Sequence, residues 1–268
     1  MSDLTFVLEF LICYDAIGDE NMNENFKELY EQFQKIKEQG WIRVPTNQKV
    51  SQGVFFEQLL KKPIENFEIP DFDGIEIKTH LKDSKSYITL FNASPDGDSF
   101  FEIERICSQY GYPDTVLKHA KILHGNVNVM KRNFIGIKYQ FRLSLNTKKK
   151  KLILYIYDRT NKVVDKSSYW SFELLEEKLR RKLRYLAYID AKKKVINQQV
   201  YYRYNQIYFY QLKDFDQFLE LLEKGIIMIT FTVGVFREGK RKGQIHNHGT
   251  AFRISREHLG KLFSQIYP

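Results

Sequence analysis

Apolar positions recur at helical spacing in residues 23–39 and at alternate positions in residues 75–80. The first pattern predicts an amphipathic helix that Gly40 ends, because one turn of an α-helix holds 3.6 residues. In the second, Ile75, Ile77 and Thr79 alternate with Glu76, Lys78 and His80. This alternation predicts a strand with one mainly apolar and one polar face. A short helix is expected at Val54–Leu60, and Tyr87–Phe91 is expected to be the hairpin partner of the strand.

The middle of the chain is expected to contain two helices and a hairpin. The first helix is predicted over Ser99–Tyr110. Two aromatic and β-branched runs, Phe134–Leu145 and Leu152–Tyr157, flank a turn-like segment and therefore predict a hairpin. Apolar residues then repeat at helical spacing over Phe172–Leu186. This basic helix is expected to expose Arg180, Arg181, Lys182 and Arg184.

The C-terminal third is expected to alternate strands and helices irregularly. The predicted strands are Gln206–Leu212, Ile226–Val233 and Thr250–Ile254, and the predicted helices are Asp214–Lys224 and a segment capped by Ser255 that runs through Ile266. The whole order favours an α+β fold with a mixed central sheet flanked by helices, rather than a doubly wound nucleotide-binding fold. Neither a P-loop nor a dinucleotide-binding glycine motif occurs, which argues against the common ATP- and NAD-dependent classes.

Charge is distributed unevenly along the 268 residues, whose net charge is +9. Residues 1–140 hold 16 Lys and Arg against 21 Asp and Glu, whereas residues 141–268 hold 26 against 12. The second half therefore has the balance of a polyanion-binding surface, with nucleic acid the first candidate and an anionic membrane the second. A solvated, lysine-rich surface is the alternative.

The cysteines and the N-terminal apolar stretch indicate the cell compartment. Cys13 and Cys107 are far apart in sequence, which fits neither a disulfide framework nor a thiolate zinc site. The apolar stretch from Leu4 to Cys13 is short, is interrupted by Glu9 and lacks a basic leader. It therefore predicts a buried helix or strand rather than a signal peptide or membrane span. A reducing cytoplasm is therefore expected.

Two carboxylates and an ammonium are expected to converge around the strand at residues 75–80. Glu76 and Lys78 share its polar face, and Asp71 stands at its entry after Pro70. Carboxylate oxygens are the natural ligands of Mg²⁺, which can neutralise a scissile phosphate and activate water. A lysine beside the attacking water can offset the charge that develops in the transition state. The same spacing also occurs in exposed edge strands whose charges discourage pairing.

The amino-acid sequence around these residues is similar to that of a known nuclease family. Three segments resemble the MvaI/BcnI family of restriction endonucleases. They are Gly-Val-Phe-Phe-Glu-Gln-Leu-Leu at 53–60, the run from Glu65 to His80, and Tyr-Ile-Thr-Leu-Phe at 87–91. This family is related to the mismatch-repair nickase MutH within the PD…(D/E)xK superfamily. Two further segments are similar to this family, Lys-Ile-Lys-Glu-Gln-Gly-Trp-Ile at 35–42 and His-Asn-His-Gly-Thr-Ala-Phe-Arg-Ile at 246–254. The resemblance is weakest over residues 145–225.

The resemblance implies a restriction-endonuclease-like fold whose two lobes grip double-stranded DNA in a cleft. It implies a catalytic lobe at residues 1–140 and a basic recognition lobe at 141–268, with an approximate boundary and lobes that can interleave. Glu57 matches a glutamate that joins the metal site, Asp71 and Glu76 match the ligands of Mg²⁺, and Lys78 completes the motif. Mn²⁺ is the expected substitute metal. His80, on the same strand face as Lys78, is a secondary catalytic candidate that would contact the scissile phosphate or the attacking water, and a hydrogen-bonded structural histidine is the alternative.

The implied activity is that of a type II restriction endonuclease, a monomer that nicks the two strands in turn and is accompanied by a DNA methyltransferase. A MutH-like strand-specific repair nickase is the alternative enzyme. A non-catalytic DNA-binding relative is the alternative from another class, although Asp71, Glu76 and Lys78 are all present.

Base recognition is expected near the C-terminus. His246 and His248, two apart on a strand, point to the same side and can bind a metal or contact bases or phosphates, of which DNA contact is preferred. Arg253 is a candidate bidentate partner of guanine, with a surface ion pair as the alternative. The basic run that begins at Arg237 is expected to contact or steer DNA through its charge.

Overall fold

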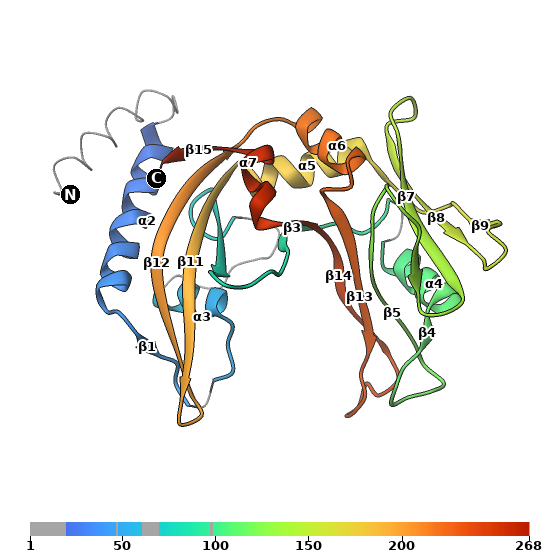
Figure 1. Ribbon diagram of the computed structural model, residues 1–268, viewed down its shortest axis with the longest axis horizontal. Helices are drawn as coiled ribbons and strands as arrows, with labels where there is room; N and C mark the ends of the chain where they lie inside the picture. The colour runs from blue at the N-terminus through green and yellow to red at the C-terminus, as the bar shows by residue number, and fades with distance from the viewer. Residues whose placement is uncertain (1–19, 47, 61–69, 97–98, 268) are drawn as a thin grey trace. The chain divides into compact units, whose positions relative to one another are not determined.

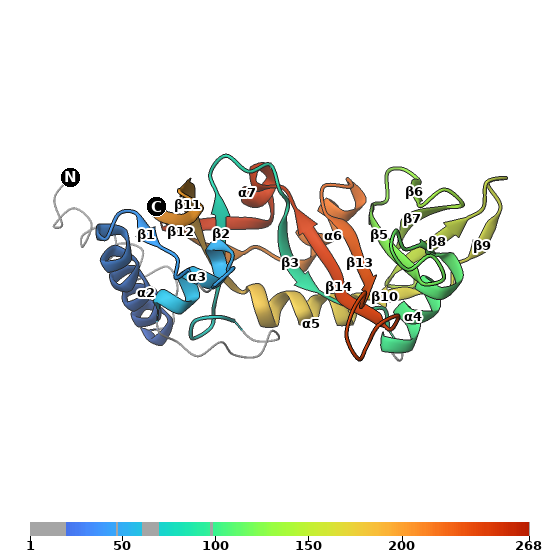
Figure 2. The same ribbon diagram turned by 90° about the horizontal axis from the view of Figure 1, so that it is seen from below.

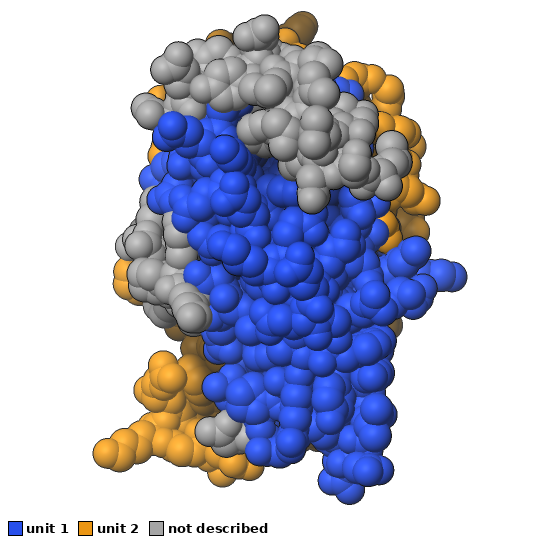
Figure 3. All heavy atoms as spheres, turned by 90° about the vertical axis from the view of Figure 1, so that its left-hand side faces the viewer, with its two compact units in different colours: residues 1–86, 180–213, 263–268 blue, residues 87–179, 214–262 orange. Residues whose placement is uncertain are grey.

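The computed structural model describes residues 20–46, 48–60, 70–96 and 99–267, and it divides into two compact units (Figure 3). Unit 1 comprises residues 1–86, 180–213 and 263–268, and unit 2 comprises residues 87–179 and 214–262. The units therefore interleave along the chain, whereas the expected boundary near residue 140 lies inside unit 2. The predicted element at Leu4–Cys13 is outside the described residues.

Unit 1 is built around a mixed sheet with the strand order β1-β12-β11-β2, and β15 pairs with β12. Its elements are α2 (Glu20–Glu38), β1 (Ile42–Arg43), α3 (Gln52–Leu59), β2 (Ile75–Leu81), β11 (Tyr185–Ile196), β12 (Gln199–Leu212) and β15 (Phe263–Tyr267). Strand β2 runs parallel to β11, and the other pairs of this sheet are antiparallel. Figure 1 shows β11 and β12 as a long curved hairpin with α2 beside it.

The core of unit 1 lies between this sheet and its two helices. Phe26, Leu29 and Phe33 of α2 are buried, because the helical repeat of the sequence directs them to one side. Phe56 of α3 packs edge-on against Tyr204 of β12, with ring centroids 4.9 Å apart. Figure 2 shows α2 and α3 next to β1 and β2. Both helices were expected from the sequence, and together they cover one face of the sheet.

Unit 2 holds two further five-stranded sheets among the described residues. The first has the order β3-β14-β13-β5-β4 and the second β10-β8-β7-β6, with β9 paired to β8. The strands are β3 (Ile88–Asn92), β4 (Tyr112–Pro113), β5 (Lys121–Val127), β6 (Asn133–Ile135), β7 (Tyr139–Asn146), β8 (Lys151–Tyr157), β9 (Val163–Asp165), β10 (Tyr169–Ser171), β13 (Met228–Val235) and β14 (Ile245–Ile254). The helices are α4 (Ser99–Tyr110), α5 (Phe172–Leu183), α6 (Phe215–Glu223), the 3₁₀ turn η1 (Arg256–His258) and α7 (Leu259–Leu262).

Three expected elements differ in extent. The helix predicted over 172–186 ends at Leu183, and Leu186 belongs to β11. The run 134–145 divides into β6 and β7, of which β7 forms the predicted hairpin with β8. The C-terminal helix is only η1 and α7, followed by β15, and Ser255 makes no side-chain capping hydrogen bond. Apolar spacing alone does not separate a short helix from the strand that follows it.

The prediction that Tyr87–Phe91 pairs with the strand at 75–80 is wrong. β3 pairs with β14 in unit 2, and β2 pairs with β11, where Lys78 is opposite Tyr188. Nearness in sequence favoured a hairpin, but strand partners are chosen by long-range packing. The mixed α+β class, in contrast, is confirmed. Within the described residues no helix is both long and apolar enough to span a bilayer.

Candidate functional site

The turn before β2 brings Asp71 back onto the strand. Asp73 and Gly74 both have positive φ angles, 39° and 89°, and Phe72 and Ile75 exchange backbone hydrogen bonds of 2.9 and 2.7 Å around them. An Asp-Gly pair is suited to such a tight turn, because both central residues must adopt the left-handed region. The Asp71 Oδ2 atom accepts a 2.9 Å hydrogen bond from the Ile77 amide. The turn thus fixes an exposed carboxylate at the entry of β2.

Glu76 lies at the centre of the site and is fully buried. Its Oε1 atom receives the ammonium of Lys78, two residues along the same strand, and lies 3.4 Å from Lys182 Nζ. In the described part of the chain, Glu76 Oε2 is buried with no hydrogen-bond partner. One carboxylate oxygen is therefore neutralised by two lysines, while the other remains available to a ligand.

Lys182 was not predicted to belong to this site. The sequence placed it on the exposed side of a basic helix, but its side chain is 15% exposed and is directed to Glu76, whereas Arg180, Arg181 and Arg184 are exposed. It stands in the last turn of α5, directly before β11, which pairs with β2. The pairing of β11 with β2 brings Lys182 to the carboxylate. The only sequence signal was its place in a run of four basic residues within 180–184.

Both glutamates of the site have pKa values above the ordinary value of a glutamate. Burial raises the pKa of Glu76 to about 7, Lys78 opposes this shift, and Asp71 adds to it. Burial also raises the pKa of Glu57 on α3, and the neighbouring Asp71 raises it further. The two glutamates and Asp71 therefore influence one another, as carboxylates that share a site do.

Helix α3 is held against the strand that carries the site. Ser51 caps the helix by accepting from the Val54 amide, and the Tyr204 hydroxyl donates to the Gln52 carbonyl at 2.8 Å. The Gln52 amide nitrogen in turn donates to the Thr79 carbonyl of β2 at 3.3 Å. These contacts keep Glu57 half-buried and near Asp71.

The oxygen-rich centre fits a hard divalent cation. Among the described residues no cluster of three or more His, Cys, Asp or Glu side chains has metal-binding geometry. Mg²⁺, however, usually takes one or two carboxylates and completes its shell with water and substrate phosphate. The free Oε2 of Glu76 and the exposed carboxylate of Asp71 provide that set.

His80 is held within unit 1 rather than directed into the site. It is 6% exposed, and its Nε2 lies 3.0 Å from both the carbonyl and the hydroxyl oxygen of Ser86. Its ring also stacks on Tyr188, with centroids 6.3 Å apart. This geometry favours the structural alternative for His80 over a phosphate contact.

A second polar surface covers one face of the sheet β3-β14-β13-β5 in unit 2. His246 and His248 come together there, with ring centroids 3.8 Å apart, and border a cavity of about 430 Å³ with His124 of β5. In the antiparallel pair of β13 and β14, Arg253 is opposite Met228 and His246 is opposite Gly234. Both side chains lie on the face of the sheet opposite to that of the buried Phe231. Arg253 Nε is buried and, within the described residues, has no hydrogen-bond partner. The histidines and Arg253 thus share a face of the sheet, and the irregular register between Phe231 and Val233 lies between them.

Arg237 differs from the other predicted DNA contacts. Its Nη2 lies 2.8 Å from Asp114 Oδ2, and its Nε donates to Oδ1 of the same carboxylate at 3.3 Å. The Arg237 guanidinium holds the pKa of Asp114 well below its usual range. The guanidinium is therefore already committed to an ion pair.

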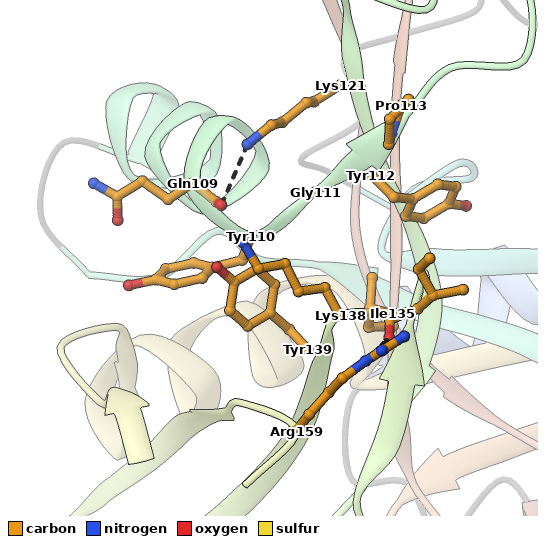
Figure 4. Close-up of a pocket in the computed structure, with 11 residues that line it drawn as sticks. Gln109, Tyr110, Gly111, Tyr112, Pro113, Lys121, Ile135, Lys138, Tyr139 and Arg159 are labelled. Carbon is orange, nitrogen blue, oxygen red and sulfur yellow. Dashed lines mark hydrogen bonds between the residues drawn. The ribbon is translucent and has the colours of Figure 1, made fainter. Parts of the chain in front are cut away.

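Another cavity of unit 2, of about 520 Å³, lies between α4, β4 and β7 (Figure 4). Tyr110, Tyr112 and Tyr139 contribute to its lining, and Lys121 Nζ is engaged by the Gln109 carbonyl at 3.3 Å. Among the described residues, those that line this cavity include no carboxylate, histidine, cysteine or serine.

Comparison with known proteins identifies the family of the chain. The model of the MvaI/BcnI restriction endonuclease family matches residues 30–263. Restriction endonuclease MvaI in complex with cognate DNA is 32% identical, with a TM-score of 0.82, covering 91% of this chain and 98% of MvaI. MvaI in the absence of DNA is also 32% identical, with a TM-score of 0.58, covering 90% and 96%. No curated protein matches the chain in sequence.

Proposed function

The chain belongs to the MvaI/BcnI restriction endonuclease family, and from this premise we propose that Asp71, Glu76, Lys78 and Lys182 hydrolyse DNA phosphodiester bonds with Mg²⁺. Membership makes the protein a site-specific type II endonuclease that acts on double-stranded DNA, the substrate with which MvaI was solved. The α+β fold with a mixed sheet is that of these restriction endonucleases. The finer assignments below are proposals.

The observation that carries the proposal is the asymmetric environment of Glu76. Two lysines neutralise Oε1, while Oε2 is buried without a partner in the described residues. A buried, unsatisfied carboxylate oxygen costs stability, so such a group is retained where a ligand completes it. Glu76 and Asp71 would hold a Mg²⁺ ion, which suits these oxygen donors, and Mn²⁺ would be the substitute.

When bound, the cation neutralises the scissile phosphate and lowers the pKa of a water molecule. Lys78 then holds its ammonium beside that phosphate, where negative charge accumulates in the transition state. Lys182 balances the charge of the buried Glu76, so that Lys78 is not wholly committed to it. Glu57, half-buried on α3, orients the water or the metal from the Asp71 side.

Several further properties belong to the proposal. Unit 1 serves as the catalytic part, and His246, His248 and Arg253 of unit 2 contact DNA bases or phosphates. Arg237 adds positive charge near them, although its ion pair with Asp114 limits direct contact. The protein acts as a monomer that nicks the strands in sequence, works in the prokaryotic cytoplasm, and is paired with a methyltransferase that protects host DNA.

Cleavage of supercoiled plasmid and genomic DNA tests the proposal. We expect nicked and then linear plasmid with Mg²⁺, no product in EDTA, and loss of cutting in Lys78→Ala. Lys85→Ala, an exposed lysine of the same unit, is the matched control and should cut normally. Sequencing the fragment ends identifies the site, and accumulation of nicked circles alone would favour a strand-specific nickase. Full activity of Lys78→Ala would refute the proposed centre.

A further inference from the structure

The β11–β12 hairpin continues past the end of β2 with a concentration of positive charge. β2 ends at Leu81, opposite Ala191, while β11 and β12 extend to the turn at Asn197 and Gln198. Residues 191–204 contain four basic side chains and no Asp or Glu. The four are Lys192, Lys193, Lys194 and Arg203. All the charged side chains of this extension of unit 1 are therefore positive.

Strand alternation divides these lysines between the two faces of the sheet. Ala187, Ile189 and Ala191 are buried in the core, so the even-numbered residues of β11 lie on the opposite face. That face also carries Glu76 and Lys78, which are opposite Leu186 and Tyr188 in the parallel pair. Lys192 and Lys194 therefore lie on the face of the candidate active site, and Lys193 lies on the face of Tyr202, which belongs to the core.

The bulge in this hairpin does not disturb the division. Asp190 is opposite Gln206 and Ala191 is opposite Tyr204, so the extra residue is Asn205 of β12. The alternation along β11 is continuous, because Ala191 is buried on the same side as Ile189. The acidic Asp190 shares the face of Lys192, but it is buried and precedes the extension.

Two aromatic rings lie beside the ammonium of Lys194. Lys194 Nζ lies 4.4 Å from the centre of the Trp41 ring and 5.4 Å from that of Tyr201. Arg203 is opposite Lys192, and Arg43 of β1 is opposite Tyr201, so both add charge to the same face. A cation over an aromatic ring is partly pre-ordered, which lowers the entropic cost of using it as a contact.

We propose that Lys192, Lys194 and Arg203 bind the sugar-phosphate backbone of DNA engaged at Lys78. These two lysines and the arginine are together called the lysine strip. The inference rests on the proposed endonuclease function. Tyr188 of β11 is opposite Lys78, and Lys192 lies four positions further along the same strand, a distance of about 13 Å. Residues two apart on a strand are about 7 Å apart, comparable with successive phosphates of one DNA strand. Because only phosphates are contacted, the strip contributes affinity without sequence preference.

Lys193 provides a matched control. Lys192→Ala, Lys193→Ala and Lys194→Ala each remove one positive charge from the same three-residue run. Binding of each variant to a mixed-sequence duplex in EDTA is measured over a range of NaCl concentrations. Each phosphate contact contributes about −0.9 to the slope of log K against log salt. We expect Lys192→Ala and Lys194→Ala each to reduce the slope by about 0.9, and Lys193→Ala to leave it unchanged.

Cleavage separates this inference from the proposed function. At saturating DNA, the double variant Lys192→Ala/Lys194→Ala should retain the wild-type rate, with a raised KM. If all three single variants change the slope equally, or if none does, the lysine strip is overturned while wild-type cleavage still supports the nuclease. If the wild type neither binds nor cuts duplex DNA, the proposed function fails and the inference fails with it. Melting temperatures of the variants exclude misfolding as the cause.

Discussion

Lys182 Nζ lies 3.4 Å from Oε1 of the fully buried Glu76, which also receives Lys78. Glu76 thus has two lysines, one from its own strand and one from the end of α5. Burial disfavours the ionised form of this carboxylate and raises its pKa, while the two lysines oppose that shift. This relationship predicts different effects on cleavage and on DNA binding when Lys182 is replaced.

Replacement of Lys182 by Met should lower single-turnover cleavage by about 100-fold, because the charge on Glu76 is then balanced by Lys78 alone. Binding of duplex DNA in EDTA should remain, since Lys182 is mostly shielded from solvent. Arg181→Met, the exposed neighbour, is the control and should cut as the wild type does. Equal losses in both variants would mean that the helix acts only through its net charge.

The stability of the metal-free protein should fall as pH rises from about 4.5 to about 7. Burial raises the folded-state pKa of Glu76 to about 7 from its ordinary value of 4.5, so the folded protein holds the proton more tightly than the unfolded chain. That stabilisation is complete below the unfolded pKa and is lost as pH passes the folded pKa. Denaturant unfolding in EDTA measures it, and Glu76→Gln should lack this part of the pH dependence. An unchanged profile in Glu76→Gln would assign the effect to other groups.

Arg253→Ala should relax base specificity. Its Nε is buried without a partner in the described chain, so a DNA acceptor would complete it. Loss of a bidentate contact to guanine costs about 1–3 kcal/mol of discrimination at one base pair. Cleavage of the mapped site and of single-base variants measures this. If rates on all sequences fell together, Arg253 would be a phosphate contact or a structural residue.

The Arg237–Asp114 pair should stabilise unit 2 at neutral pH and cease to do so in acid. Arg237 lowers the pKa of Asp114, so its contribution is present above the unfolded pKa of about 3.8 and is lost as pH falls through the lower folded value. Arg237→Ala should therefore melt a few degrees below wild type at pH 7, and the gap should close in acid. Arg241→Ala is the control, because Arg241 stacks on Phe236, 3.9 Å from the ring centre. A gap that is independent of pH would indicate lost packing instead.

Local patterns were sufficient for much of this protein. The repeat of Phe26, Leu29 and Phe33 predicted α2, because a helix has a fixed period of its own. The alternation around Glu76 and Lys78 placed both on one strand face for the same reason. Resemblance in short runs of residues supplied the family, and the family model and the MvaI structures confirm it.

Contacts between distant segments were decided only by the tertiary structure. The parallel pairing of β2 with β11 brought Lys182 to Glu76 and placed the ring of His80 against that of Tyr188. It also decided which of the three consecutive lysines share the face of Glu76, namely Lys192 and Lys194 but not Lys193. A side chain's partner across a sheet depends on which strands pack together and in what register. That choice is made by the burial of the whole core and leaves no mark at the residue itself.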